Sequence, residues 1–107
     1  MTAYAVGYFE EVEMGPEIVA YLEAIDATLA PFGGRFLIHG GDKNVLEGEW
    51  PGDLVVIAFP DMDGARAWYE SPTYARLLPL RLNKAKGAVI LIEGVCQDHK
   101  ATDILAG

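Results

Sequence analysis

The residue best suited to chemistry in this chain is His39, which directly precedes a pair of glycines in the segment IHGG. An imidazole titrates close to neutral pH, so it could act as a general acid or base on a small bound molecule. The same histidine could instead have a structural role and fix a bend in the backbone by hydrogen bonding. No carboxylate stands at a spacing that identifies it as a partner, and both interpretations stay open.

Aromatic and cationic side chains supply candidates for a ligand site. Trp68 and Tyr74 could line a pocket, since amphipathic rings commonly form ligand walls, or they could be core packing. Arg35 and Arg81 could bind a carboxylate through two parallel hydrogen bonds, or could pair with acidic residues of the chain. Arg81 is the better candidate because it lies in a segment that we expect to be irregular.

Metal and nucleotide chemistry find no support in the sequence. Cys96 and His99 are separated by two residues and have no second pair, whereas a structural zinc site needs four ligands. The chain has no phosphate-binding loop, dinucleotide fingerprint or Ser-His-Asp constellation. Neither histidine falls on an expected helix, where a haem ligand is usually found. We therefore expect no metal and no cofactor.

The composition indicates one globular domain. The 107 residues are 51% hydrophobic and 22% charged, which is too apolar for a disordered chain. The formal net charge of −8 argues against nucleic acid as a partner, because phosphates would be repelled. No apolar run approaches the roughly 18 residues needed to span a bilayer, and the N-terminus lacks a basic region followed by an apolar one. With a single cysteine, we expect a cytoplasmic protein.

The site candidates need a sheet to position them, and its most informative part is the segment 33–48 (GGRFLIHGGDKNVLEG). We expect one long strand that bends at Gly40 and Gly41, where glycine permits a positive φ. The first half, 35–39, would lie in the main sheet, and the second half, 45–47, would reach toward another element. His39 would then share a strand face with Arg35 and Leu37.

The other elements follow from hydrophobic periodicity and turn residues. We expect strands at 3–12, 54–59 and 88–95, a first helix from Pro16 to about Pro31, and a second helix over 62–70. A third helix should begin at Pro72 behind a Ser71 N-cap and be broken by Pro79, with 80–87 irregular or one last turn. Residues 96–107 are expected to form a tail behind a domain of residues 1–95, either frayed or docked on a neighbour.

The order of strand, helix, strand, strand, helix and strand predicts an α+β, ferredoxin-like antiparallel sheet with the helices on one face. Three of the expected strands, at 3–12, 54–59 and 88–95, carry apolar residues on both faces, and the helices can cover only one. Because large exposed apolar patches are rare on soluble monomers, we expect a homodimer paired sheet against sheet around a two-fold axis. A higher oligomer stays open.

Several motifs together resemble one bacterial family. They are residues 33–37 (GGRFL), 40–41 (GG), 45–48 (VLEG) and 67–74 (AWYESPTY). This combination resembles the domain-of-unknown-function family numbered 1330 (DUF1330) over about residues 3–95. The resemblance implies a dimeric α+β barrel fold, shared with small cofactor-free monooxygenases, lactone isomerases and haem-degrading enzymes, and no agreed activity. The family commonly has an Arg before the second glycine pair, where this chain has His39.

Two functions from different classes fit these observations. The first is a cytoplasmic homodimer that binds a small organic molecule between sheet and helices, with cofactor-free isomerase or monooxygenase-type chemistry suggested by the resemblance. Its catalytic candidate is His39, and its ligand-binding candidates are Arg35, Trp68, Tyr74 and Arg81. The second is a non-catalytic assembly or protein-interaction module whose tail, with Ile104 and Leu105, docks on a neighbouring subunit.

Overall fold

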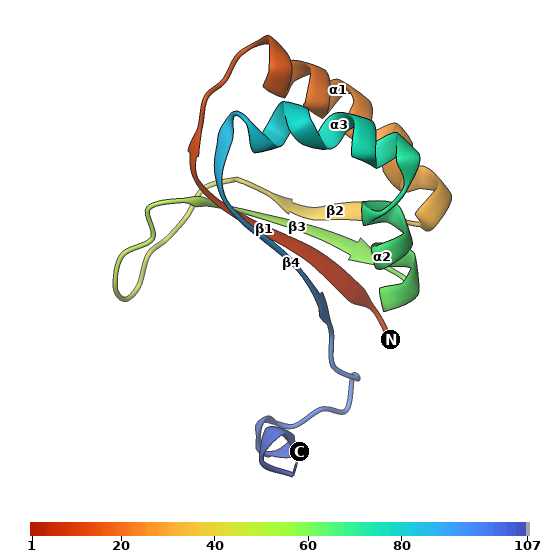
Figure 1. Cartoon of the computed structure of the whole chain (residues 1–107). Coiled ribbons are helices and arrows are strands. Elements are labelled where there is room, and N and C mark those ends of the chain that lie inside the picture. Colours follow the sequence, from red (N-terminus) through yellow and green to blue (C-terminus); the bar gives the residue numbers. More distant parts are fainter. Residues whose placement is uncertain (107) are drawn as a thin grey trace.

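An antiparallel sheet of four strands, in the order β2-β3-β1-β4, carries the helices on one face (Figure 1). In this computed structural model, which describes residues 1–106, the strands are β1 (Ala3–Val12), β2 (Arg35–His39), β3 (Asp53–Phe59) and β4 (Ala85–Glu93). The central strand β1 pairs with β3 on one side and with β4 on the other. This arrangement confirms the predicted ferredoxin-like α+β fold.

Three α-helices, α1 (Pro16–Leu29), α2 (Met62–Tyr69) and α3 (Pro72–Leu82), cover the sheet. A short 3-10 turn, η1 (Ala30–Phe32), follows α1 and ends at Gly33, whose φ of 71° is one that glycine adopts without strain. The side chains of Asp61 and Ser71 cap α2 and α3 by accepting hydrogen bonds from the backbone N–H groups of Gly64 and Tyr74. The caps therefore start both helices where the sequence predicts.

The predicted break at Pro79 is wrong, because α3 continues through it to Leu82. Proline removes one backbone donor from the helix, but the next turn stays closed, since the N–H of Asn83 donates to the carbonyl of Pro79 at 3.2 Å. The helix also packs against α1, which holds its last turn in place. Arg81 consequently comes from a regular helix and points inward, where it is buried.

The core lies between the sheet and the helices, toward the end of the sheet that α2 covers. Its largest fully buried side chains are Trp68, Tyr74 and Phe59. The indole N–H of Trp68 donates to the hydroxyl of Thr28 at 3.0 Å, which ties α2 to α1. Around these side chains are Ala3, Ala5, Tyr21, Ile25, Leu29, Ile57 and Ala65.

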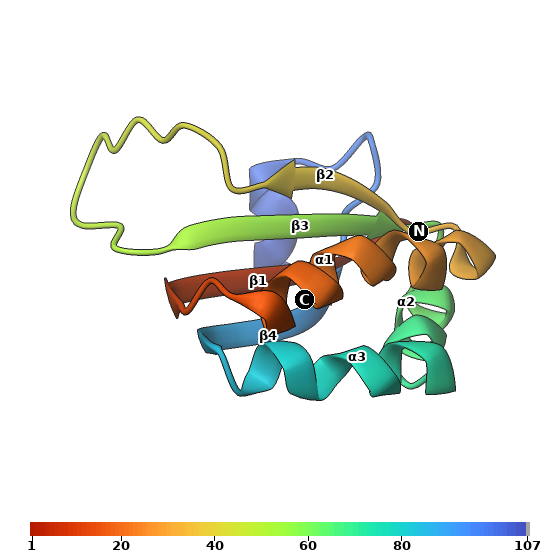
Figure 2. The ribbon, with the colours of Figure 1, turned by 90° about the horizontal axis from the view of Figure 1, so that it is seen from above.

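The second half of the predicted bent strand is not a strand. The chain leaves the sheet after His39, and residues 40–52 form a loop that projects beyond the ends of β2 and β3 (Figure 2). Gly40, Gly41 and Gly48 have φ values of 71°, 99° and 70°, so they turn the backbone away from the sheet. The N–H of Gly40 still donates to the carbonyl of Leu54 in β3 at 2.9 Å, but no described strand pairs with residues 41–52. Pairing of the loop with a partner subunit stays a prediction.

A bulge does occur in β2, but it falls at Leu37 and not at the glycines. The pairing with β3 is Arg35↔Ala58, Phe36↔Ile57, Ile38↔Val56 and His39↔Val55. Leu37 has no partner, and this extra residue changes the alternation of side chains along the strand. Phe36 and His39 consequently both point toward the helices, whereas Arg35 lies on the other face. The prediction that His39 shares a face with Arg35 is therefore wrong.

The face of the sheet turned away from the helices, here called the open face, is apolar. One row of paired residues crosses all four strands of the sheet as Ile38, Val56, Val6 and Ile90, and neighbouring positions hold Tyr4, Tyr8, Leu54 and Ile92. Ile90 and Ile92 are 52% and 49% exposed. Apolar residues therefore do occupy both faces of β1, β3 and β4, as the sequence predicts.

The C-terminal segment leaves β4 and ends in a 3-10 turn, η2 (Ala101–Leu105). Figure 1 shows this turn standing off the sheet on the side opposite the helices. Its apolar residues Ile104 and Leu105 are exposed. Within residues 1–106, no helix has the length and apolar character needed to cross a membrane.

Candidate functional site

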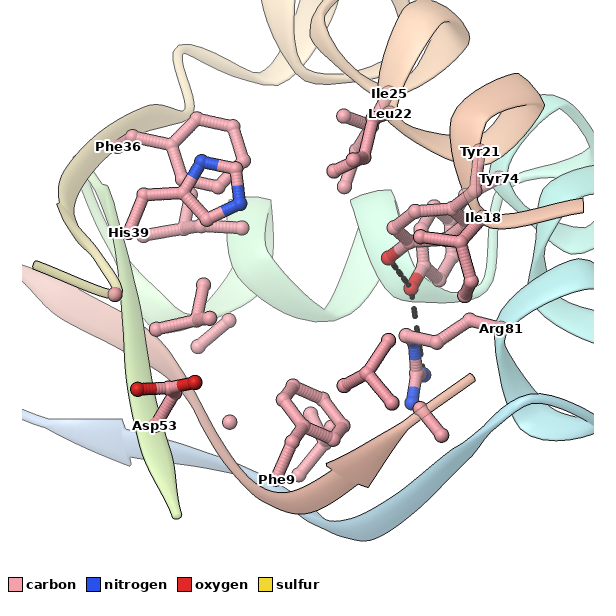
Figure 3. A pocket seen from close by; sticks show the side chains of 18 of the residues that line it. Phe9, Ile18, Tyr21, Leu22, Ile25, Phe36, His39, Asp53, Tyr74 and Arg81 are labelled. Carbon is pink, nitrogen blue, oxygen red and sulfur yellow. Dashed lines mark hydrogen bonds between the residues drawn. The ribbon is translucent and has the colours of Figure 1, made fainter. Parts of the chain in front are cut away.

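A cavity of about 430 Å³ lies between the helix-facing side of the sheet and helices α1 and α3 (Figure 3). Its floor comes from β1 and β3, where the central strand contributes the small residues Ala5 and Gly7. The side chain of Ala5 is a single methyl group, and the ring of Phe9 lies over Gly7, with its Cε2 atom 2.7 Å from the place that a Cβ of Gly7 would take. The remaining apolar walls include Phe9, Val12, Ile18, Leu22, Ile25, Phe36, Val55, Ile57, Trp68 and Val89.

One end of the cavity holds a polar group made of Tyr21, Tyr74 and Arg81, here called the Arg81 cluster. The hydroxyl oxygens of Tyr21 and Tyr74 are 2.6 Å apart and share a hydrogen bond. The Nη2 group of Arg81 donates to the Tyr74 hydroxyl at 3.5 Å. The guanidinium carbon lies 5.4 Å from the ring centre of Phe9 and 5.9 Å from that of Tyr21. The cation is therefore enclosed by aromatic rings.

The surroundings of the Arg81 cluster keep Tyr21 neutral and Arg81 charged. Burial raises the pKa of Tyr21, and its contact with Tyr74 raises it further. For Arg81, burial lowers the pKa, but the neighbouring oxygens of Tyr74 and Tyr21 outweigh burial and leave the pKa raised. Arg81 is only 7% exposed and makes no ion pair with any residue from 1 to 106. A buried charge without a counter-ion is uncommon in proteins.

His39 lies at the other end of the cavity, beside its rim. Its imidazole is stacked on the ring of Phe36, with centroids 4.6 Å apart and an interplanar angle of 11°. The imidazole makes no hydrogen bond to another residue in the range 1–106. The nearby carboxylate of Asp53 faces the rim and is paired with Lys43 at 2.6 Å. Figure 3 shows His39 and Arg81 facing each other across the apolar space.

The structure brings most of the predicted site residues together. His39, Trp68, Tyr74 and Arg81 all line the cavity, although they are far apart in the sequence. Arg35 does not line it, because the bulge places Arg35 on the open face. No group of three or more His, Cys, Asp or Glu side chains suited to a metal ion occurs within residues 1–106.

Tyr21 and Phe9 belong to the site and were not among the candidates from the sequence. Tyr21 follows Ile18 by three positions and precedes Ile25 by four, so it borders the apolar stripe of α1 and could have been found from that spacing. Phe9 lies on the same face of β1 as Ala5 and Gly7, but its contact with Arg81 depends on how α3 is placed.

The cavity can hold a ligand whose middle part is uncharged and whose two ends carry charged or polar groups. Tyr74 accepts a hydrogen bond from Arg81, and when it also accepts from Tyr21 its own O–H is free to donate to a ligand. Fixed donors of this kind stabilise negative charge on a ligand oxygen, such as that of a carboxylate or an enolate. His39 offers a proton acceptor at the opposite end.

Comparison with known proteins shows the family and the fold of this chain. The sequence profile of the family described as "Domain of unknown function (DUF1330)" matches residues 2–95. No curated protein matches the sequence. Among solved structures, the chain is similar to a protein of unknown function from Rhodopseudomonas palustris, with 14% identity and a TM-score of 0.65, covering 89% of this chain and 83% of that one.

Two further solved structures share the fold. One is SnoaB, a cofactor-independent oxygenase from Streptomyces nogalater, with 15% identity and a TM-score of 0.60, covering 92% of this chain and 98% of that one. The other is a dimeric ferredoxin-like protein of unknown function from Jannaschia sp. CCS1, with 18% identity and a TM-score of 0.59, covering 88% of this chain and 100% of that one. At these identities the similarity concerns the fold.

Proposed function

The chain belongs to the DUF1330 family, and we propose that it is a homodimer that binds a small organic molecule in the cavity between its sheet and helices. The observation that carries the proposal is the cavity of about 430 Å³ itself, lined largely by apolar and aromatic side chains with polar groups only at its ends. Sites for small molecules in proteins are typically of this size and character. Trp68, Tyr74, Arg81 and His39 are the residues that we propose contact the ligand.

The chemistry that this site supports best is cofactor-free and begins with proton removal from the ligand. His39 would accept a proton from a carbon next to a carbonyl group, and the Arg81 cluster would hold the oxygen on which negative charge develops. Return of the proton to another carbon gives an isomerisation. Reaction of the same carbanion with dioxygen, with the substrate supplying the electrons and water as the second product, gives a monooxygenation. SnoaB, which shares the fold, is described as a cofactor-independent oxygenase.

The proposed homodimer would cover the open face. The row formed by Ile38, Val56, Val6 and Ile90 crosses the sheet without a charged residue. Similar folds from Jannaschia sp. CCS1 and Bacteroides fragilis are described as dimeric. An isologous pairing of two open faces removes the apolar surface that the helices leave uncovered.

The ligand-binding proposal can be tested with a neutral apolar fluorescent probe, N-phenyl-1-naphthylamine. Val55 lines the cavity, so the larger side chain of Val55→Phe should fill part of it. Val19→Phe is the matched control, because Val19 is exposed on α1 and does not line the cavity. We expect the probe to bind the unmodified protein and Val19→Phe, and to lose its affinity for Val55→Phe. Absence of binding to the unmodified protein, or equal binding to both variants, would refute the proposal.

A second candidate function, assembly through the C-terminal tail, is favoured by one observation. Ile104 and Leu105 of η2 are 74% and 81% exposed, on the side of the sheet where the partner subunit would lie. We propose that these residues dock on that partner. Deletion of residues 97–107 should then reduce the number of subunits in the oligomer or raise its dissociation constant, as measured by sedimentation. An unchanged oligomer would refute this role of the tail.

A further inference from the structure

We infer that the ligand of the cavity is an organic monoanion, a carboxylate or enolate on an apolar body, whose charged oxygen binds the Arg81 guanidinium. This inference rests on the proposed function and adds the chemical class of the ligand. Arg81 is a cation at the wall of the cavity and is only 7% exposed, and no carboxylate pairs with it within residues 1–106.

Acidic residues at the cavity and near it pair with lysines and not with Arg81. Asp53 pairs with Lys43 at 2.6 Å, Glu10 with Lys86 at 3.9 Å, and Glu17 and Glu13 with Lys84 at 3.3 and 3.7 Å. Each of these four acids therefore has a lysine beside it, and none of them is a counter-ion of Arg81. Within residues 1–106, the groups that offset the burial of Arg81 are the hydroxyls of Tyr74 and Tyr21 and the faces of aromatic rings, and none of them carries a full negative charge.

The hydrogen-bonding groups of Arg81 leave room for a ligand. A guanidinium has five N–H donors in a planar fork, and a single hydrogen bond, from Nη2 to Tyr74, is recorded for Arg81 within residues 1–106. The fork matches the two oxygens of a carboxylate, which accept parallel hydrogen bonds. Because Arg81 is largely buried, such a pair is stronger than it would be on the surface.

The shape and charge of the rest of the site restrict the anion further. The walls between Arg81 and His39 are aliphatic and aromatic, so the body of the ligand must be apolar. The chain carries a formal net charge of −8, which disfavours a ligand with several negative charges. These features select a monocarboxylate or enolate over a phosphate ester or a dicarboxylate.

The experiment compares 2-naphthoate with its neutral isostere 2-naphthamide by titration calorimetry on the full-length protein. In the unmodified protein we expect the anion to bind about 10-fold or more tightly than the amide, since a charge-assisted, buried hydrogen-bond pair is lost in the amide. In Arg81→Met the ratio should fall to about one, and Arg81→Lys should restore part of it. The dianion 2-naphthyl phosphate should bind less tightly than 2-naphthoate to the unmodified protein.

Comparison with 2-naphthamide shows whether a negative result refutes only this inference or the proposed function as well. If Arg81 only supports the fold, Arg81→Met will weaken naphthoate and naphthamide equally, and the inference is overturned while the proposed function stands. If the unmodified protein binds the amide as tightly as the anion, the inference is overturned even when Arg81→Met does not fold. If neither naphthalene compound nor N-phenyl-1-naphthylamine binds, the proposed function falls, and the inference falls with it.

Discussion

Replacement of Ile90 by aspartate should separate the proposed dimer into single subunits. Ile90 lies on the open face at the end of the row that runs through Val6 and Val56, and 52% of it is exposed in the single chain. Full burial of an isoleucine side chain contributes about 1.5–3 kcal/mol, so burial of the exposed half contributes about 1 kcal/mol. Two-fold symmetry brings two copies of Ile90 into the interface, which gives about 2 kcal/mol per dimer.

This energy corresponds to a rise of roughly 30-fold in the dissociation constant of the dimer. The introduced carboxylates add to the effect, because a charge buried in an apolar interface without a partner costs several kcal/mol more. We therefore expect Ile90→Asp to sediment as single subunits at micromolar concentrations at which the unmodified protein is dimeric. Sedimentation equilibrium over a concentration series measures both dissociation constants.

Val19→Asp is the matched control for Ile90→Asp. Val19 is 46% exposed in the single chain, close to the value for Ile90, but it lies on α1 and not on the sheet. An aspartate there should leave the dimer intact. Circular dichroism of both variants checks that the secondary structure is kept. A dimer through the open face is refuted if the unmodified protein is itself a single subunit at micromolar concentration. It is also refuted if the dimers of Ile90→Asp and Val19→Asp have the same dissociation constant.

Variants at three other positions test the fold and its charges. Thr28→Val removes the acceptor of the buried Trp68 N–H, so it should lower the free energy of unfolding by about 1–3 kcal/mol in urea titrations, whereas Thr28→Ser should lose less. Pro79→Ala should raise that free energy by roughly 1–3 kcal/mol, because it restores a helical N–H donor, and a decrease would contradict the helical placement of Pro79. The pKa of Glu17 is lowered by a backbone hydrogen bond and by Lys84 at 3.3 Å, so its contribution is present at neutral pH and lost as the pH falls through that pKa. Glu17→Gln should accordingly be less stable at neutral pH and equal in acid, and a difference independent of pH would argue against this pairing.

The order of elements and their apolar faces could be predicted from the sequence because they depend on local patterns. The first strand has the bounds that the sequence predicts, Ala3–Val12, and the first helix starts at Pro16, where proline fits the first helical position. The loop 40–52 was misassigned for a physical reason. Val45 and Leu46 have strand-like composition, but a strand also needs a hydrogen-bonding partner, and no described strand of this chain pairs with them.

The candidate site could be predicted only in part, because it depends on the continuity of α3. Tyr74 and Arg81 are seven residues apart, so they lie on one face of a helix only if that helix continues through Pro79. Local rules place a break at this proline, whereas the packing of α3 against α1 keeps the helix intact. The clustering of Arg81 with Tyr21 likewise depends on the approach of two helices, which no spacing within one segment contains.

The unpaired Leu37 also bears on how relatives of this chain should be aligned. Five residues, 35–39, separate the two glycine pairs, and one of them, Leu37, has no partner in the ladder. A homologue with one residue fewer there could form a regular strand without a bulge and still direct the side chain before the second glycine pair toward the cavity. We expect the gaps of such homologues to fall in the Leu37 column, leaving the His39 column filled.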